Sequence, residues 1–235
     1  MLTNLKRFLL FFIYFFFITL KLLYSQNLLV YFTPEFSSIG DTQIIDISGN
    51  EYYCKLLNGA KVSIFDNQKV IDLGNNNGYV DFGYVFGNII STLNNFSIVT
   101  KIFIPESTDL SLNGNFIWCF SNSNNILLDA NGDMHFSAKN TRFAITLNYY
   151  PNESAITNGN QLTKGQWLTI VYIQRNNKGR IFINGKLMAA GDINISPLQL
   201  GFTKYNYLGK SCYVSDSYLK NAKILDFRIY DNALT

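Results

Sequence analysis

The stretch that decides the fold runs from Arg180 to Ala189 and reads RIFINGKLMA. Short apolar segments flank the pair Asn184-Gly185 within it. Asparagine and glycine both tolerate the positive φ angles that the central residues of a type I′ turn require. The stretch therefore predicts a β-hairpin with Asn184 and Gly185 at its tip. Asn-Gly pairs at 58–59, 113–114, 131–132 and 158–159 also separate apolar segments, so turns of this kind recur along the chain.

Alternating side chains predict longer strands before and after this hairpin. Apolar residues recur at every second position over residues 96–104, 167–173 and 225–230. In the last of these, Leu225, Phe227 and Ile229 alternate with Asp226, Arg228 and Tyr230. Further strands are predicted at 28–33, 78–82, 116–120, 134–138, 142–147 and 205–208. No segment after residue 25 has a helical pattern, so the sequence predicts an all-β sandwich or barrel of about a dozen strands.

One domain, covering residues 27–235, accounts for the remaining chain. We find no internal repeat, no linker and no abrupt change of composition in it. Its length is sufficient to bury a substantial core without metals or disulfides. Trp118 and Trp167 both lie in alternating apolar segments, and we expect both of them in that core.

Residues 1–25 predict a signal peptide. A charged leader precedes an uninterrupted apolar run from Phe8 to Leu20, and Ser25 is a small residue before the expected cleavage point. The run is shorter than the roughly 20 apolar residues of a membrane span. The alternative is an uncleaved anchor, in which Lys21 reaches the interface and the helix continues. The sequence therefore predicts a secreted, periplasmic or cell-surface protein that contacts a membrane only through this segment, if it stays uncleaved.

The positive charge of the chain lies mostly in this leader. The whole sequence has a formal net charge of +3, and residues 1–25 hold three basic residues and no acidic one. The mature chain is therefore neutral. A neutral domain has no electrostatic footprint for nucleic acid or for an anionic membrane. We accordingly expect no nucleic-acid partner.

The three cysteines, Cys54, Cys119 and Cys212, are an odd number, which leaves at least one thiol free or paired between chains. Cys119 lies in an apolar strand and is interpreted as buried. A bridge between Cys54 and Cys212 is one hypothesis for an oxidising compartment. The pairing stays open from the sequence.

Few residues could support catalysis. His135 is the only histidine, so any Ser-His-Asp or Cys-His site depends on it, and we interpret it as an ordinary strand residue. One histidine and three separated cysteines offer no spacing typical of zinc ligands. Glycosidases use paired carboxylates, and only Asp129 and Asp133, on either side of a predicted turn, are candidates for such a pair. We therefore expect no catalytic residues and no enzyme activity, with a hydrolase built on Asp129 and Asp133 as an alternative.

Calcium is the one cofactor that the sequence supports. It binds oxygen ligands in loops rich in Asp and Asn. Asp46 and Asn50 lie in such a loop, and Asp226 on the last predicted strand is the third candidate ligand. An ordinary Asx turn at Asp46 explains the same residues equally well. A structural calcium ion is therefore one of two interpretations.

Tyrosines in polar segments are candidates for sugar recognition. Pyranose rings present flat faces that stack on aromatic rings, while Asn and Asp bind hydroxyl groups. Most aromatic residues of a β domain belong to its core, so each candidate also has a structural explanation. The predicted carbohydrate-binding residues are Tyr149, Tyr150, Tyr205, Tyr213, Asp216 and Tyr218.

Ten short motifs follow one another along the chain. Each is weak evidence for a family alone, but their order is more specific. The motifs are DISGN (46–50), LNGAKV (57–62), DLG (72–74), GYVDFG (78–83), FSI (96–98), GNFIW (114–118), GQW (165–167), IFINGK (181–186), NYLGKS (206–211) and DFRIYDNAL (226–234). In this order, over residues 28–235, the sequence resembles the laminin-G-like jelly-roll modules of the concanavalin A-like lectin/glucanase superfamily, of the type appended to bacterial glycoside hydrolases.

The resemblance implies a jelly-roll sandwich of two antiparallel sheets with a concave face. It also implies a lectin-like module that binds a poly- or oligosaccharide, or that packs on a partner protein or a catalytic domain. Some modules of this kind carry calcium near the positions that match Asp46–Asn50 and Asp226. The closing motif ends with the sequence, so we expect either a free-standing module or part of a longer enzyme.

Family resemblance alone does not decide the function, because this fold hosts lectins, adhesion modules and enzymes. The favoured hypothesis is a secreted carbohydrate-binding module without catalytic activity. The alternatives are a protein-interaction module and a glycoside hydrolase with an unrecognised site.

Overall fold

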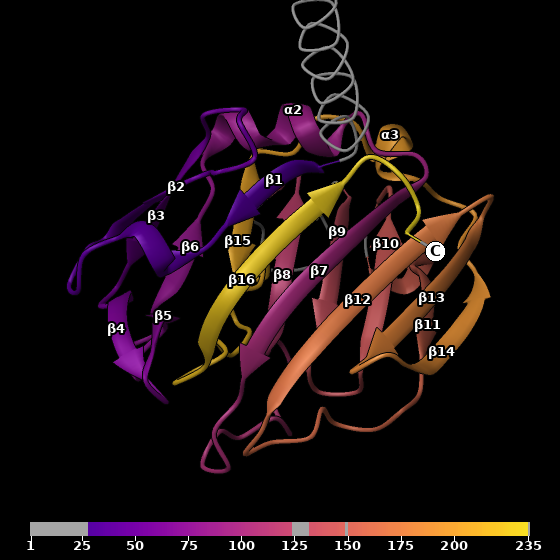
Figure 1. The fold of residues 1–235 in the computed structure, drawn as a ribbon. Helices are drawn as coiled ribbons and strands as arrows, with labels where there is room; N and C mark the ends of the chain where they lie inside the picture. The colour runs from indigo at the N-terminus through magenta and orange to yellow at the C-terminus, as the bar shows by residue number, and fades with distance from the viewer. Residues whose placement is uncertain (1–27, 124–131, 149, 235) are drawn as a thin grey trace, which may run out of the picture.

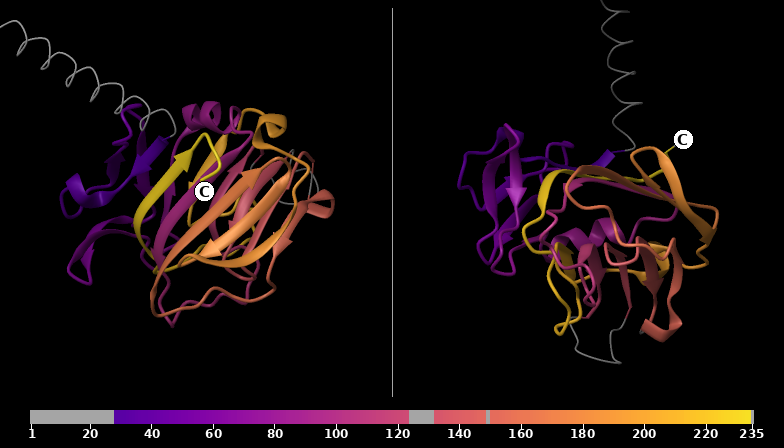
Figure 2. Two further views of the ribbon diagram at one scale, coloured as in Figure 1. Left: turned by 45° about the vertical axis from the view of Figure 1, so that its right-hand side comes forward. Right: turned by 90° about the horizontal axis from the view of Figure 1, so that it is seen from below.

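The computed structural model describes residues 28–123, 132–148 and 150–234. Two antiparallel sheets of eight strands each are stacked face to face (Figures 1 and 2). The all-β jelly-roll sandwich expected from the sequence is therefore confirmed. The predicted signal peptide, residues 1–25, lies outside the described residues.

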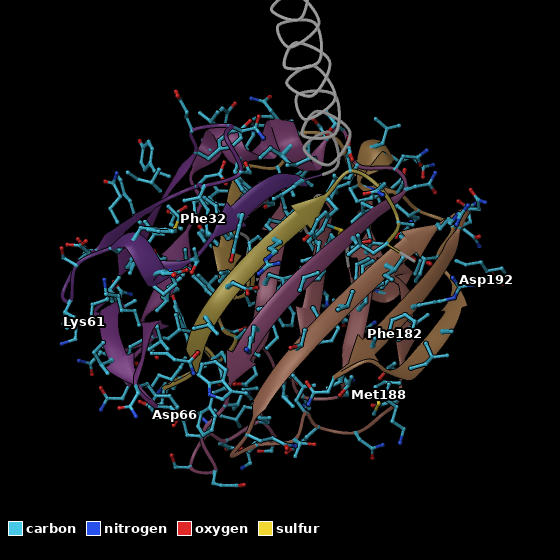
Figure 3. The ribbon with its side chains drawn as sticks, viewed as in Figure 1. Phe32, Lys61, Asp66, Phe182, Met188 and Asp192 are labelled. Atoms are coloured by element: carbon cyan, nitrogen blue, oxygen red, sulfur yellow. The ribbon has the colours of Figure 1, made fainter. Side chains whose placement is uncertain are left out.

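The front sheet of Figure 1 contains the longest strands. They are β1 (Leu28–Phe32), β4 (Lys61–Phe65), β5 (Gln68–Asp72), β7 (Phe96–Phe103), β12 (Trp167–Arg175), β13 (Lys178–Ile183), β14 (Lys186–Asp192) and β16 (Lys223–Tyr230). Their order is β14-β13-β12-β7-β16-β5-β4, and β1 also pairs with β16. Figure 3 shows Lys61 and Asp192 on opposite sides of this sheet, on its two edge strands.

The back sheet lies behind it and carries the site described below. Its strands are β2 (Gln43–Ile45), β3 (Tyr53–Leu57), β6 (Tyr79–Asp81), β8 (Phe116–Ser121), β9 (Asp133–Ser137), β10 (Arg142–Thr146), β11 (Ser154–Thr157) and β15 (Tyr205–Leu208). Their order is β11-β10-β9-β8-β15-β6-β3-β2. Strand β15, from near the end of the chain, lies between β8 and β6 and so brings the last part of the sequence to the middle of this sheet.

The hairpin predicted from Asn184-Gly185 joins β13 to β14. Asn184 has a φ of 49° and Gly185 a φ of 77°, so both turn residues adopt the left-handed backbone that a type I′ turn requires. The two long strands predicted by alternation are β7 and β12, which pair from Trp167 opposite Phe103 to Gln174 opposite Phe96. These predictions are confirmed.

Helices are short and lie outside the two layers. They are α2 (Gly87–Ile90), α3 (Pro197–Leu200) and the 3₁₀ turns η1 (Pro34–Phe36), η2 (Tyr84–Phe86) and η3 (Tyr150–Asn152). Figure 1 shows α2 and α3 along the same edge of the sandwich. No helix in the described part of the chain has both the length and the apolar character that a membrane span needs.

Aromatic rings fill the space between the sheets. Trp118 on β8 is 1% exposed, and Tyr172 on β12 is fully buried. The Tyr172 ring stacks on Phe143 of β10, with 3.7 Å between centroids and 13° between planes. These contacts join the two sheets directly. The side chains on the outer face of the back sheet take no part in this core, and the site described below is built from them.

Trp167 does not belong to this core, and that prediction is wrong. It begins β12 and is only partly buried. Its ring packs against Phe65 and Phe103, and its indole N–H donates to Asp66 Oδ2 at 3.3 Å. The alternation of β12 points Leu168 and Ile170 inward, so Trp167 necessarily lies on the opposite face.

Candidate functional site

A pocket of about 550 Å³ opens on the outer face of the back sheet, over β8, β9 and β10. We call it the outer-face pocket. Its strand residues Phe116, His135 and Ser137 are buried. The rest of its lining comes from residues 113–114 before β8, from the turn at 139–140, from the η3–β11 region and from residues 209–218, which we call the closing segment. The lining side chains used below are Phe116, His135, Lys139, Asn140, Arg142, Tyr150, Glu153, Tyr213 and Asp216.

Strand β9 supplies the polar base of the pocket. Its core-facing side chains are Met134 and Phe136. Because side chains alternate along a strand, Asp133, His135 and Ser137 leave on the outer face. The cross-strand neighbours of His135 are Cys119 on β8 and Ala144 on β10. The binary pattern of this one strand therefore places apolar rings in the core and titratable groups beneath the pocket.

Asp133 is fully buried, and each of its carboxylate oxygens has a hydrogen-bond partner. The Tyr213 hydroxyl donates to Oδ1 at 3.1 Å, and Nδ1 of His135 lies 2.6 Å from Oδ2. Burial, followed by the charge of Asp133, raises the pKa of Tyr213 well above its usual value. The phenol therefore keeps its proton and remains a donor. A buried carboxylate that is satisfied in this way fixes the positions of both rings.

His135 is held on both its edges and its face. Its ring is stacked on Phe116, with 4.0 Å between centroids and 7° between planes. With the proton on Nδ1 shared with Asp133, the other nitrogen, Nε2, accepts from Arg142 Nη1 at 3.3 Å. The imidazole therefore connects the buried carboxylate to the guanidinium in the pocket.

Arg142 and Glu153 form an ion pair at the wall of the pocket. Arg142 comes from β10 and Glu153 from the residue before β11, and Nη2 of the guanidinium contacts Oε2 of the carboxylate. Their side chains are 23% and 10% exposed, so the pair is partly shielded from solvent but still reachable. Arg142 thus bridges His135 and Glu153 and presents a fixed charge pattern to the pocket.

The closing segment contributes Tyr213 and Asp216. Its backbone is tied to the sheet, since the N–H of Ser217 donates to Asn113 O at 2.9 Å and the N–H of Asn115 donates to Ser217 O at 2.8 Å. The Ser211 hydroxyl donates to Asp216 Oδ2 at 2.7 Å. Burial is the main cause that raises the pKa of the Asp216 carboxyl above its usual value. Asp216 is therefore a partly desolvated acceptor at the pocket surface.

Three of the predicted carbohydrate-binding residues line the outer-face pocket, namely Tyr150, Tyr213 and Asp216. Tyr150 comes from η3, and Tyr213 and Asp216 come from the closing segment about 60 residues later in the sequence. Tyr149 lies outside the described residues. The structure therefore brings together half of a set that was selected only for its composition.

Tyr205 and Tyr218 do not belong to that pocket. Tyr205 is on β15, with its ring 6.5 Å from that of Tyr207, and Tyr218 is 5.9 Å from Tyr79. Lys210 Nζ lies 4.3 Å from the ring centres of Tyr79 and Tyr207 and 5.8 Å from that of Tyr218. A cation so close to aromatic faces is attracted by their electrons. The chain's own lysine therefore occupies this second group of tyrosines.

Four residues that line the pocket or lie beneath it had another interpretation or none in the sequence. His135 was expected to be an ordinary strand residue, and Arg142 and Glu153 were not selected. Asp133 was considered only as half of a hydrolase pair with Asp129, which lies outside the described residues. One signal in the sequence could have found Asp133 and His135. These two polar residues alternate with the apolar Met134 and Phe136, which places them on the face of the strand opposite the core.

Asp46 and Asn50 act as anchors for β1 in this structure. Asp46 Oδ1 accepts from the N–H groups of Tyr31 at 2.7 Å and Ser48 at 3.0 Å, and Oδ2 accepts from the Ser48 hydroxyl at 2.7 Å. The Asn50 amide donates to Leu29 O at 2.9 Å. Three donors that converge on Asp46 repel a cation from the same oxygens, so this arrangement favours the Asx-turn interpretation.

Asp226, the third candidate calcium ligand, is paired with Arg228. The guanidinium donates to Asp226 Oδ2 at 2.9 Å and lies over the Tyr31 ring, 4.2 Å from its centre. Asp226 Oδ1 is buried without a hydrogen-bond partner. Since Arg228 already balances the charge, the three residues fit a calcium ion poorly as they are arranged. Calcium binding stays a prediction.

Among the residues that the structure describes, two groups of potential metal ligands share Asp133. Cys119, Asp133 and Cys212 form one, and Asp133, His135 and Glu153 form the other, with ligand atoms within 4.8 Å of one another. In the second group Arg142 already pairs with Glu153, and His135 already pairs with Asp133. These bonds satisfy the groups without a metal. The first group is considered under the further inference.

A family model matches residues 110–235, more than half of the chain, and it contains β8–β16 and the whole lining of the outer-face pocket described above. The model is that of the concanavalin A-like lectin/glucanases superfamily, Laminin_G_3. The chain belongs to this superfamily. A comparison with curated protein sequences finds no match.

Solved structures share the fold at low sequence identity. Domain 4 of AbnA, a GH43 extracellular arabinanase from Geobacillus stearothermophilus in complex with arabinotriose, matches with a TM-score of 0.65 and 13% identity, over 89% of this chain and 95% of that one. The botulinum neurotoxin serotype C1 binding domain matches with a TM-score of 0.60 and 18% identity, over 90% of this chain and 50% of that one. Trypanosoma rangeli sialidase in complex with the inhibitor DANA matches with a TM-score of 0.57 and 12% identity, over 88% of this chain and 31% of that one.

Proposed function

We propose that this chain is an exported, non-catalytic module that binds a poly- or oligosaccharide in the outer-face pocket. The observation that carries the proposal is the composition of that pocket, where tyrosines, carboxylates, a guanidinium and two amides line one hollow of about 550 Å³. Membership of the superfamily supports it. So does the similarity to an arabinanase domain whose structure holds arabinotriose.

The pocket offers both kinds of contact that a sugar ring uses. Tyr150 is 57% exposed, so its ring is available to stack on the C–H face of a pyranose or furanose. Asp216 and Glu153 are acceptors for hydroxyl groups, and Arg142 and Asn140 are donors. Because Asp216, Glu153 and Arg142 are held by hydrogen bonds within the chain, a glycan meets a site that needs little reorganisation.

A matched pair of tyrosine variants tests the assignment of the site. Tyr150 begins η3 in the pocket, and Tyr84 begins η2 away from it, with similar exposed fractions of 57% and 61%. For any glycan that binds, Tyr150→Ala is expected to weaken the affinity about tenfold, the cost of one lost stacking contact. Tyr84→Ala should leave the affinity unchanged. Equal affinities of both variants and the parent in calorimetric titration would remove the pocket from the proposal.

We propose binding without hydrolysis because the carboxylates of the pocket are already engaged. Glu153 pairs with Arg142, and Asp133 is fully buried. The raised pKa of Asp216 is the observation that favours the hydrolase alternative, since a general acid needs such a shift. Incubation of bound glycans with the parent chain and with Asp216→Asn separates the two. Product from the parent chain alone would establish a hydrolase.

A second candidate function is docking on a partner protein or on a catalytic domain. The observation that favours it is a set of exposed apolar side chains around η1, β2 and β4, which are Phe36, Ile39, Ile45 and Ile64. Phe36 alone is 74% exposed. If these residues dock a partner, the chain should associate in a concentration-dependent manner with a catalytic domain, and Phe36→Ser should abolish the association. Unchanged association of Phe36→Ser would reject this surface.

A further inference from the structure

Two of the three cysteines meet on the outer face of the back sheet. Cys119 leaves β8 on that face, and Cys212 lies in the closing segment above it. Both are 0% exposed, and they form a small apolar cluster with Phe116, against which Tyr213 packs. Their sulfur atoms lie within 4.8 Å of each other. The two thiols are therefore neighbours, and both are shielded from solvent.

Strand register produces this contact. Tyr207 on β15 lies opposite Cys119, and the chain leaves β15 after Leu208. Gly209 has a φ of 77°, and its N–H donates to Ile117 O at 2.9 Å. After this turn the closing segment lies over the outer face of the sheet, and Cys212 packs against Cys119 there. Neighbouring positions in the sheet, rather than chance proximity of two loops, bring the thiols together.

The third cysteine is on the other face of the same sheet. Cys54 on β3 belongs to the core between the two sheets. A bridge between Cys54 and Cys212 does not fit this placement, because the back sheet lies between the two side chains. Of the three cysteines, Cys119 and Cys212 are therefore neighbours, and Cys54 lies apart from them in the core.

We propose that Cys119 and Cys212 form a disulfide bond that fastens the closing segment to the back sheet. The bond forms by exchange with a disulfide oxidant, either a thiol–disulfide oxidoreductase or oxidised glutathione. One thiolate attacks the oxidant and releases its first thiol, and the second cysteine then attacks the mixed disulfide and releases the other. The cysteines lose two protons and two electrons, and the oxidant becomes two thiols.

The timing of this step follows from burial. Desolvation raises the pKa of both thiols, so few thiolates exist once the segment has closed. The exchange therefore belongs to folding, before Tyr213 and Cys212 cover Cys119. After closure, the same burial keeps reductants away from the bond, so reduction requires unfolding.

A metal between the same residues is the competing use of this cluster. Asp133 is close enough to join Cys119 and Cys212 as a third ligand. Its two oxygens already accept from Tyr213 and His135, however, and a metal would have to displace a donor. The disulfide needs no such displacement. It would also hold Tyr213 and Asp216 in place at the pocket, but its formation does not depend on what the pocket binds.

Thiol counting on the full chain tests the proposal. The chain is refolded with reduced and oxidised glutathione, then denatured without reductant and labelled with N-ethylmaleimide. The parent chain should show one labelled thiol, at Cys54. Cys54→Ala should show none, while Cys119→Ala and Cys212→Ala should each show two. Peptide mapping should recover the Cys119–Cys212 peptide. A chain that is reduced while denatured and then refolded without oxidant should melt about 5–15 °C lower than the oxidised chain.

Other results overturn the proposal. Three labelled thiols in the parent chain after oxidative refolding, or a bridge that contains Cys54, would exclude the Cys119–Cys212 bond. Three thiols together with one equivalent of zinc would favour the metal instead. Because the Cys54→Ala count and the peptide map use chains with both partner cysteines intact, a folding defect in the other variants leaves the test decisive.

Discussion

Tyr213 lines the outer-face pocket and donates a hydrogen bond to the fully buried Asp133. Tyr213→Phe removes that donor and leaves Asp133 Oδ1 without it. A buried acceptor that loses its partner costs about 1–3 kcal/mol, so the free energy of unfolding should fall by this amount in urea titrations. Tyr205→Phe is the matched control, since Tyr205 lies on the same sheet outside the pocket. Equal stability of the two variants would contradict the role assigned to the Tyr213 hydroxyl.

The carboxyl of Asp216 gives the site a pH dependence. Its pKa in the folded chain is raised from 3.8, chiefly by burial. Between the two values the folded chain binds a proton that the unfolded chain does not, so its stability falls as the pH rises through this window. Above the raised pKa the penalty of the buried charge is fully present. Asp216→Asn should flatten this part of the pH–stability curve, and an identical slope in urea titrations from pH 4 upward would contradict the shift.

At the scale of single residues, the sequence predicted which residue types suit a sugar site better than it predicted which side chains contact each other. Tyr150, Tyr213 and Asp216 were selected because polar aromatic segments suit sugars, and they do line one pocket. The contact of His135 with Arg142 was not predictable, because it depends on which residues of β9 and β10 face each other. A one-residue change of register would have moved His135 to the core.

Strand β1 depends on the loop before β3 as well as on its pairing with β16. Asp46 receives two backbone N–H groups and a hydroxyl there. Asp46→Ala should therefore lower the free energy of unfolding by about 1–3 kcal/mol, as for other buried acceptors that are removed. If the anchoring interpretation holds, the loss is the same in calcium and in chelator. A parent chain that melts at a higher temperature in calcium, with Asp46→Ala insensitive to it, would establish the calcium site instead.

Strand β16 shows where alternation succeeds and where it fails. Phe227 and Ile229 alternate as predicted and face the core, but Leu225 does not share their face. The pairing of β16 with β7 is shifted between Ile224 and Asp226, so a bulge inserts one extra residue there. Ile224 takes the buried position in place of Leu225. A period of two predicts the strand, but a bulge is set by the partner strand and is not visible in the alternation.

At the scale of the whole molecule, the order of short motifs along the chain predicted the sandwich. The turn at Asn184-Gly185 and the long strands β7 and β12 were predictable because local preferences and burial agree there. The edge strands β2 and β4 were not predicted, since they are short and half exposed. The contact of Cys119 with Cys212 was also out of reach, because it needs β15 to lie beside β8. Long-range strand order therefore limits what the sequence reveals about the site.

The central claim is that the outer-face pocket binds a glycan, and a broad glycan array tests it most directly. The purified chain is screened once with calcium and once with chelator, beside Tyr150→Ala and Tyr84→Ala. The account predicts a specific set of oligosaccharides bound by the parent chain and by Tyr84→Ala, with a clearly weaker signal for Tyr150→Ala. A blank array in both conditions, from a chain whose cooperative thermal unfolding shows that it is folded, would contradict the claim and favour the docking function.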